Sequence, residues 1–215
     1  MAYQADLFLQ YSVVMSNEEQ KLGQSDSQQF SFYNFTIVLV SFLASYLVVA
    51  KVISPMQKQY ISDSDLVSLL FLPHGVRVLA CVLYGPRLGA FYLFSATFLT
   101  GFWAGSLGNY NPLTLTLLYA VGALSVPLAF IFLQFIYEDT KIGLTMVKHN
   151  TIKTIAYLAL ISSILNSIGH ALVLDGFSAF EVKPRIILQF LTGDLLGTLV
   201  LFLCLRFVLN RIKLS

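Results

Sequence analysis

Apolar stretches of membrane-spanning length recur along this sequence from about residue 30 to the C-terminus, separated by short polar segments. An α-helix needs about 20 mostly apolar residues to cross the ~30 Å hydrocarbon core of a bilayer. In lipid, backbone polar groups must bond within the structure, which favours helices over irregular chain. Charged residues make up only 11% of the chain, less than half of the ~25% typical of soluble domains. The sequence therefore predicts an all-α, polytopic membrane helical bundle.

We expect about six transmembrane helices, covering about residues 33–53, 66–84, 88–106, 113–137, 151–172 and 186–209. The second span contains Pro73, and proline removes a backbone hydrogen bond and clashes with the preceding turn of a helix. This span is therefore either kinked at Pro73 or broken, with residues 66–72 entering the membrane separately and the helix starting near Pro73. We favour the broken form. Gly85-Pro86-Arg87 predicts a tight turn before the third span, and we expect Gly122 and Pro127 to interrupt the fourth.

The chain divides into a polar N-terminal tail at residues 1–32 and an integral membrane domain at residues 33–215. We interpret the tail as cytoplasmic, with residues 2–15 as a candidate interfacial helix. Six spans place both termini on one side of the membrane, and basic residues favour the cytoplasmic side. The side of the termini carries Lys21, Arg87, Lys141, Lys148, Lys153, Arg206, Arg211 and Lys213, against Lys51, Lys58, Lys183 and Arg185 on the other. This excess predicts that both termini face the cytoplasm.

Two charged residues lie well away from the ends of the predicted spans, Arg77 in the second and Asp194 in the sixth. A charge at the bilayer centre costs about 2.5–3.5 kcal/mol even on the most permissive scale. Both helices would enter from the outer face, and a rise of ~1.5 Å per residue places the two side chains at similar depths. The sequence therefore predicts that Arg77 and Asp194 pair within the membrane.

Three further polar residues, His74, Asn166 and His170, fall in the outer half of the predicted bundle and complete a candidate ligand-binding cluster with the charged pair. An intramembrane ionisable residue is a candidate functional group, yet a buried ion pair can also serve packing alone. His74 is a candidate pH sensor, because imidazole changes charge near physiological pH; the alternative is an interfacial histidine bonded to a carbonyl or water. His74, His170 and Asp194 could approach one another as metal ligands, but no spacing demands it, and we expect neither a metal nor another cofactor.

Small residues recur at four-residue spacing in the third span, at Thr97, Gly101 and Gly105. They lie on one helical face and predict close packing against another helix of the bundle, with dimerisation as the alternative. No hydrolase motif, phosphate-binding loop or pair of catalytic carboxylates is found, so we predict no enzymatic activity and no catalytic residues. The basic residues are spread over loop ends, which gives no indication of nucleic-acid binding.

Three short motifs follow one another along the chain. Residues 72–76 read Leu-Pro-His-Gly-Val, residues 83–87 read Leu-Tyr-Gly-Pro-Arg, and residues 193–197 read Gly-Asp-Leu-Leu-Gly. Their order and separation resemble those of membrane-associated sensor domains of the MASE type, over about residues 66–211. The resemblance implies a structural role for Pro73, Gly75, Gly193 and Gly197.

Domains of this family usually precede histidine kinases or diguanylate cyclases, and they perceive a signal at or within the membrane. The resemblance implies a bacterial inner-membrane protein. No output domain follows Ser215 in this sequence, so we expect a separate protein partner in the membrane or cytoplasm. His74 and Arg77 stand where many relatives have smaller or apolar residues, so the ligand site of the family is not transferred to this chain.

We consider three functions. The first is a sensory or signalling accessory protein that responds to a membrane or periplasmic cue, with an unidentified small-molecule ligand. The second is a small-solute transporter or its substrate-binding subunit, which six helices and a broken span suit, although the sequence shows no internal repeat. The third is a structural partner in an envelope assembly, in which the charged pair only fixes the bundle.

Overall fold

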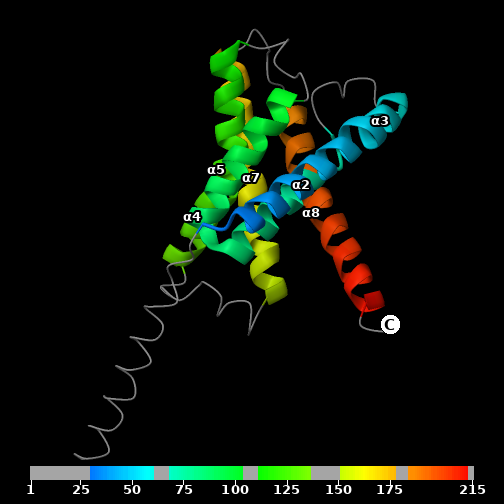
Figure 1. Cartoon of the computed structure of the whole chain (residues 1–215). Helices are drawn as coiled ribbons and strands as arrows, with labels where there is room; N and C mark the ends of the chain where they lie inside the picture. The colour runs from blue at the N-terminus through cyan, green and yellow to red at the C-terminus, as the bar shows by residue number, and fades with distance from the viewer. Residues whose placement is uncertain (1–29, 61–67, 104–110, 137–150, 178–183, 213–215) are drawn as a thin grey trace, which may run out of the picture. The chain divides into compact units, whose positions relative to one another are not determined.

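The structure, a computed structural model, describes residues 30–60, 68–103, 111–136, 151–177 and 184–212. Residues Phe32–Ser215 form one compact unit. Among the described residues the elements are all helical: α2 (Phe32–Val48), the π-helix η1 (Val49–Ile53), α3 (Ser54–Tyr60), α4 (Leu72–Trp103), α5 (Pro112–Ile136), α7 (Thr151–Phe177) and α8 (Pro184–Ile212) (Figure 1). The predicted all-α fold is confirmed. Residues 2–15, the candidate interfacial helix, lie outside the described residues.

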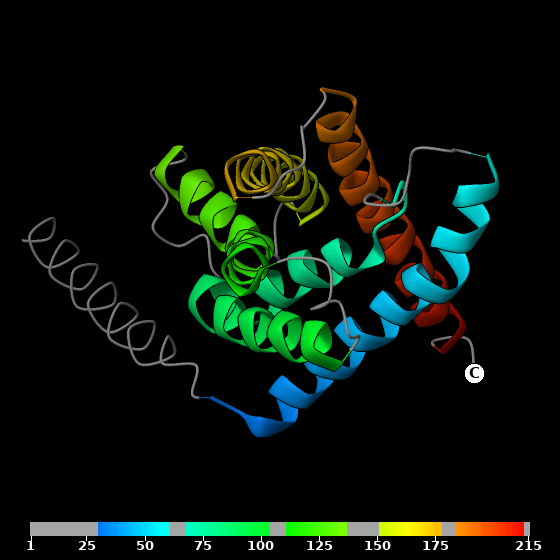
Figure 2. The same cartoon turned by 90° about the horizontal axis from the view of Figure 1, so that it is seen from above.

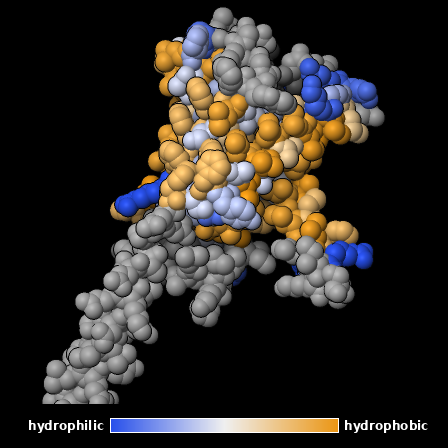
Figure 3. Space-filling model, viewed as in Figure 1, coloured by the Kyte–Doolittle hydropathy of each residue, from blue (hydrophilic) through white to orange (hydrophobic). Residues whose placement is uncertain are grey.

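Five helices in the described part of the chain are long and apolar enough to cross a membrane: Phe32–Gln59, Leu72–Gly101, Pro112–Leu133, Lys153–Phe177 and Pro184–Val208. Large apolar side chains stay exposed on their outer faces, including Leu172, Phe135 and Phe207. In Figure 3 hydrophobic residues cover the middle of the face in view, and hydrophilic residues gather toward its ends. Such a surface suits contact with lipid, so the chain is a multi-pass membrane protein.

The predicted count of six is approximate, because the second and third predicted spans both fall within α4. Gly85 breaks this helix with a φ of 75° and a ψ of 168°, a backbone conformation open mainly to glycine. A Cβ on Gly89 would lie 2.9 Å from the Cα of Cys81, so the chain folds back on itself, and Figure 2 shows the two segments side by side. The segment 72–84 rises only about 20 Å, less than the ~30 Å needed to span alone.

Several predicted helix ends were wrong. The first span does not stop at residue 53, because α3 continues it to Tyr60 through Pro55. The π-helix lies directly before this proline, and its altered hydrogen bonding is one way to accommodate the missing N–H and the ring. α5 is continuous through Gly122 and Pro127, where we expected an interruption. α7 and α8 also extend beyond the predicted ends, to Phe177 and Ile212.

α4 is the central element, in contact with α2, α5, α7 and α8. Its inward side chains, together with those of α2, α5 and α7, form a single apolar core. The core residues include Val38, Phe42, Val78, Cys81, Tyr92, Leu93, Val126, Phe130 and Leu158. Because α4 contacts every other long helix, its starting position fixes where polar groups from those helices meet.

The start of α4 is set by a contact between two stretches of backbone. Residues 68–71, which we call the entry segment, are not helical, and α4 begins at Leu72, in agreement with the broken form of the second span. A Cβ on Gly193 would overlap the carbonyl oxygen of Ser68, and one on Gly197 would overlap that of Phe71. The N–H of Phe71 donates a 2.9 Å hydrogen bond to the Gly193 carbonyl. These two glycines, the glycine notch of α8, therefore let the entry segment rest directly on the α8 backbone.

A helix cap ties the start of α5 to the end of α7. Asn111 precedes Pro112, and its Oδ1 accepts a 2.8 Å hydrogen bond from the N–H of Thr114, the arrangement expected of an N-cap residue. The Nδ2 of Asn111 and the hydroxyl of Thr114 both donate to the carbonyl of Phe177, near the end of α7. The first turn of α5 is therefore bonded to the last turn of α7.

Replacing Gly197 with alanine tests the glycine notch. The added methyl would overlap the Phe71 carbonyl, and such overpacking typically costs about 1–3 kcal/mol. We expect Gly197→Ala to lower the melting temperature of the detergent-purified chain. Gly176→Ala is the matched control, because a Cβ there meets nothing within 4 Å and alanine is the better helix former. An unchanged melting temperature for Gly197→Ala would contradict the contact.

Candidate functional site

The glycine notch places the start of α4 deep inside the bundle. Gly193 and Gly197 lie about 14–20 Å along α8 from its first residue at ~1.5 Å per residue. The first turn of α4 therefore sits far from either end of α8, next to Asp194 within the notch. A helix N-terminus carries a partial positive charge, which favours a carboxylate beside it.

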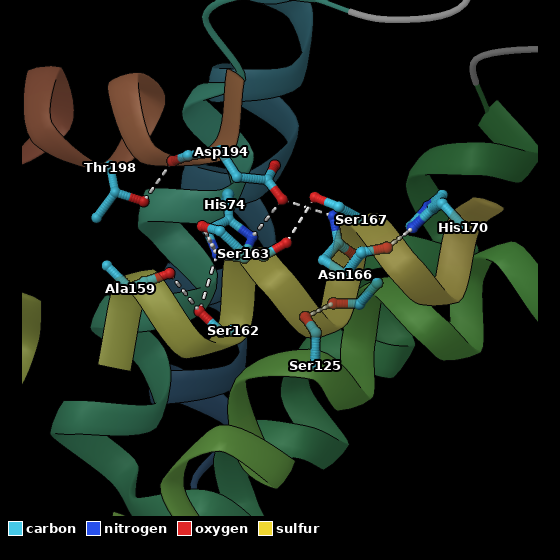
Figure 4. A network of polar contacts seen from close by, with 11 residues as sticks. His74, Ser125, Ala159, Ser162, Ser163, Asn166, Ser167, His170, Asp194 and Thr198 are labelled. Carbon is cyan, nitrogen blue, oxygen red and sulfur yellow. Dashed lines mark hydrogen bonds and ion pairs between the residues drawn. The ribbon is translucent and has the colours of Figure 1, made fainter. Parts of the chain in front are cut away.

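Asp194 is the centre of the polar cluster and is only 1% exposed. Its Oδ2 accepts a 2.7 Å hydrogen bond from the Nδ2 of Asn166 and lies 3.5 Å from the Nδ1 of His74 (Figure 4). Its backbone carbonyl accepts a 2.8 Å bond from the hydroxyl of Thr198. No hydrogen bond from the described residues reaches Oδ1. α4, α7 and α8 each contribute one member of this contact.

His74 is fully buried and lies between Asp194 and two serines of α7. Its Nε2 is 3.0 Å from the hydroxyl oxygen of Ser162 and 3.4 Å from that of Ser163. Ser162 also donates to the carbonyl of Ala159 at 3.1 Å. If Ser162 gives its proton to Ala159, Nε2 carries a hydrogen and donates to Ser162, and a neutral His74 then turns a lone pair toward Asp194. The position of one proton therefore decides whether His74 and Asp194 attract or repel each other.

Arg77 is also buried, with 4% of its surface exposed, and its Nε and Nη1 have no hydrogen-bond partner. The guanidinium lies 5.5 Å from the ring centres of Phe42 and Phe71, within range of cation–π attraction. A Cβ on Gly122 would lie 2.6 Å from Nη2, so a side chain at this position of α5 would displace the guanidinium.

The predicted direct pair between Arg77 and Asp194 does not form in this structure. The two groups interact electrostatically, but no hydrogen bond or ion pair joins them. The reason is geometric, because His74 and Asn166 approach Oδ2 of the carboxylate, while the guanidinium turns toward Gly122 and the two aromatic rings.

Of the two remaining residues of the predicted cluster, one contacts Asp194 and the other does not. Asn166 contacts Asp194, and its own Oδ1 is buried without a partner. His170 does not contact Asp194; its Nδ1 lies 2.9 Å from the backbone carbonyl of Asn166, and its ring packs 5.1 Å from the ring of Phe190. The structure therefore brings His74, Asn166 and Asp194 together, with Arg77 and His170 beside them.

Sequence analysis missed the serines of α7. Ser162 and Ser163 contact His74, and the hydroxyl of Ser167 donates to the Ser163 carbonyl at 2.6 Å. A signal was present, because Ser163, Ser167 and His170 recur at three- or four-residue spacing along one span. That spacing places polar groups on one helical face.

The structural motif residues pack against one another as well. Gly75 lies against α8, where a Cβ would be 2.8 Å from Cδ2 of Leu201 and 3.1 Å from the Cα of Thr198. Pro73 is buried in the first turn of α4. The motif at residues 72–76 therefore interlocks with the motif at residues 193–197, although 117 positions separate Gly193 from Val76 (193 − 76) in the sequence.

The stripe of small residues lies elsewhere. Gly101 packs against α5, where its Cβ would overlap the hydroxyl of Tyr119. The hydroxyls of Thr97, Thr100 and Tyr119 are buried without hydrogen-bond partners. Gly105 lies outside the described residues. This second polar group carries no charge, and none of its contacts among the described residues involves Asp194.

Ser162, His74 and Asp194 are connected in the order of a Ser–His–Asp triad. Ser162 is fully buried in the middle of α7, where neighbouring N–H groups are engaged in helical hydrogen bonds. An oxyanion hole needs free donors beside the nucleophile, so the arrangement is a buried polar network. Among the described residues, no group of three His, Cys, Asp or Glu side chains could hold a metal ion.

No protein-family model, curated protein or solved structure matches this chain. The site must therefore be interpreted from its own geometry: a carboxylate, an imidazole and an amide in contact, beside a guanidinium that has no hydrogen-bond partner.

Substituting Arg77 tests whether its charge stabilises the fold. Breaking a buried ion pair usually costs about 3–5 kcal/mol, whereas replacing buried charge by an apolar group is often neutral or stabilising. Because Arg77 has no hydrogen-bond partner, we expect Arg77→Met to keep the free energy of unfolding in mixed micelles within about 1 kcal/mol of the wild type or to raise it. Asn166→Leu is the comparison, and losing its bond to Asp194 should cost about 1–3 kcal/mol. A loss of 3 kcal/mol or more in Arg77→Met would show that Arg77 is structural.

Proposed function

We propose that this chain is an integral membrane sensory or signalling accessory protein, in which the buried polar cluster responds to a membrane or periplasmic cue. The observation that carries the proposal is the state of the charges: Asp194 and Arg77 are both buried, and Nε and Nη1 of Arg77 have no hydrogen-bond partner within the described part of the chain. Burying charge in this way is expensive. Native proteins leave few buried polar groups unpaired, and such groups cluster at functional sites.

A purely structural role is less consistent with these contacts. A charged pair that only fixed the bundle would be expected to satisfy its own hydrogen bonds, because an incomplete buried network destabilises a fold. Instead Arg77 is held by two rings and the surface of Gly122. The third function considered from sequence, a structural envelope partner, therefore has the weakest support.

The cluster lies between helices that contact the rest of the bundle, so a change in its contacts could move those helices. His74 lies in the first turn of α4, which contacts every other long helix. Asp194 lies in α8. Toward the C-terminal end of this helix the side chains of Leu203, Phe207 and Val208 are exposed. A ligand or proton that alters the contact between His74 and Asp194 would shift α4 against α8. We propose that a separate protein in the membrane or cytoplasm detects this movement.

The proposed location is the bacterial inner membrane, with both termini in the cytoplasm. We propose that the entry segment and the segment 72–84 together act as one crossing, which would keep both ends of the chain on one side. Arg87 and Arg211 are exposed near the proposed cytoplasmic ends of their helices, consistent with the enrichment of basic residues on that side. The resemblance to MASE-type sensors stays a prediction.

Transport is the second candidate function, and one observation favours it. A helix that starts deep in the bundle after a non-helical segment is typical of the broken helices that bind substrates in secondary transporters. Time-dependent uptake of a labelled solute into proteoliposomes holding the purified chain would support transport. Binding without uptake would support sensing.

Complementation in the source cell tests the sensory proposal. Cells lacking the chain would be supplied with wild type, Asp194→Asn or the control Thr97→Val, which alters the second polar group. We expect Asp194→Asn to reach wild-type membrane levels and to reduce chain-dependent changes in transcripts or protein phosphorylation about tenfold or more, within the usual range of site coupling. Thr97→Val should respond normally. Full complementation by Asp194→Asn would overturn the proposal.

A further inference from the structure

The polar cluster contains unused hydrogen-bonding groups of both kinds. Nε and Nη1 of Arg77 are donors without acceptors, and Oδ1 of Asn166 is an acceptor without a donor. Oδ1 of Asp194 likewise receives no hydrogen bond from the described residues. Nδ1 of His74 is also without a hydrogen bond. A buried group without a partner typically costs about 1–3 kcal/mol, so an occupant that satisfied several of them would bind favourably.

These groups come from three helices that pack against one another. The guanidinium of Arg77 rests on Gly122 of α5. The adjacent Val121 packs on Gly169 of α7, where a Cβ would lie 2.6 Å from Cγ1 of Val121. Gly169 is less than one helical turn from Asn166, which bonds Asp194. Arg77 also interacts electrostatically with Asp194 and with His170. The unused donors and acceptors therefore belong to one site.

The site contains one positive and one negative group that do not pair with each other. An occupant of a low-dielectric site is favoured when it satisfies both without adding net charge. A carboxylate suits the planar, multiply donating guanidinium of Arg77. An ammonium group has donors only, which suits the oxygens of Asp194 and Asn166.

We propose that the polar cluster binds a small zwitterion of the α-amino-acid type, with its carboxylate on Arg77 and its ammonium group on Asp194 and Asn166. The proposal rests on the proposed function, because it names the class of ligand that the sensory site recognises. A simple anion would satisfy Arg77 and leave the acceptors unmet, and a simple amine would do the reverse. Water could bond to all of these groups but would not neutralise either charge.

Ligand-dependent thermal unfolding of the full-length chain tests the proposal. The chain would be purified in mild detergent and its melting temperature measured with each standard amino acid, starting with glycine and alanine at 10 mM. We expect at least one amino acid to raise the melting temperature saturably by about 5 °C. Acetate and methylamine, which each carry one of the two charged groups, should give no comparable rise.

Variants then locate the binding. Arg77→Gln and Asp194→Asn should each weaken the amino-acid effect at least tenfold in concentration, and Thr97→Val and the exposed Arg206→Gln should leave it unchanged. If a site variant fails to fold, the comparison of amino acids with acetate and methylamine on the wild type still decides the question. A rise with acetate equal to that with amino acids, or no rise with any amino acid, would overturn the proposal.

The two proposals fail in different ways. If no amino acid binds and Asp194→Asn still abolishes the cellular response, the ligand class is wrong and the sensory function stands. If amino acids bind and Asp194→Asn still complements fully, the site binds its ligand without the proposed signalling role.

Discussion

The close approach of the entry segment to the backbone of α8 is the constraint on which the rest of the structure depends. Side chains at residues 193 and 197 would fill the space that the carbonyls of Ser68 and Phe71 occupy. With glycine at both positions, the Phe71 N–H reaches the Gly193 carbonyl, and α4 begins deep in the bundle instead of at its edge. This start sets the depth of His74 and Arg77, both in the first turns of α4.

Because these residues lie deep in the bundle, each polar group in the cluster without a hydrogen-bond partner costs free energy. His74, Arg77, Asn166 and Asp194 are all at most 4% exposed, so bulk solvent does not reach them to compensate for missing partners. Oδ2 of Asp194 accepts a hydrogen bond from Asn166, whereas the Asn166 amide oxygen and the Nε and Nη1 of Arg77 have no hydrogen-bond partner among the described residues. In a medium of low dielectric, such groups respond strongly to any added proton or ligand. The same glycine contacts that build the fold therefore create the sensitivity that we assign to the site.

Sequence alone predicted the membrane class, the break near Pro73 and the residues that form the centre of the site, because lipid penalises charge and proline restricts helices in ways that a sequence displays. It did not predict that Arg77 turns toward Gly122 or that serines of α7 hold His74, because both depend on which helix faces which. Pro55 misled the placement of a helix end, and Pro127 misled us to expect an interruption within a helix, since neighbouring helical structure absorbs a proline that would break an isolated helix. The separation of Arg77 from Asp194 is a tertiary outcome, set by the partners that reach Oδ2.

A double-mutant cycle between His74 and Asp194 tests the central claim most directly, because only seating of the entry segment in the glycine notch brings these side chains from α4 and α8 together. The free energy of unfolding would be measured in mixed micelles for wild type, His74→Ala, Asp194→Asn and the double variant. The account predicts a coupling energy of about 1 kcal/mol or more, as found for residues in one network. Additivity within about 0.5 kcal/mol would show that the two residues are independent and would contradict it.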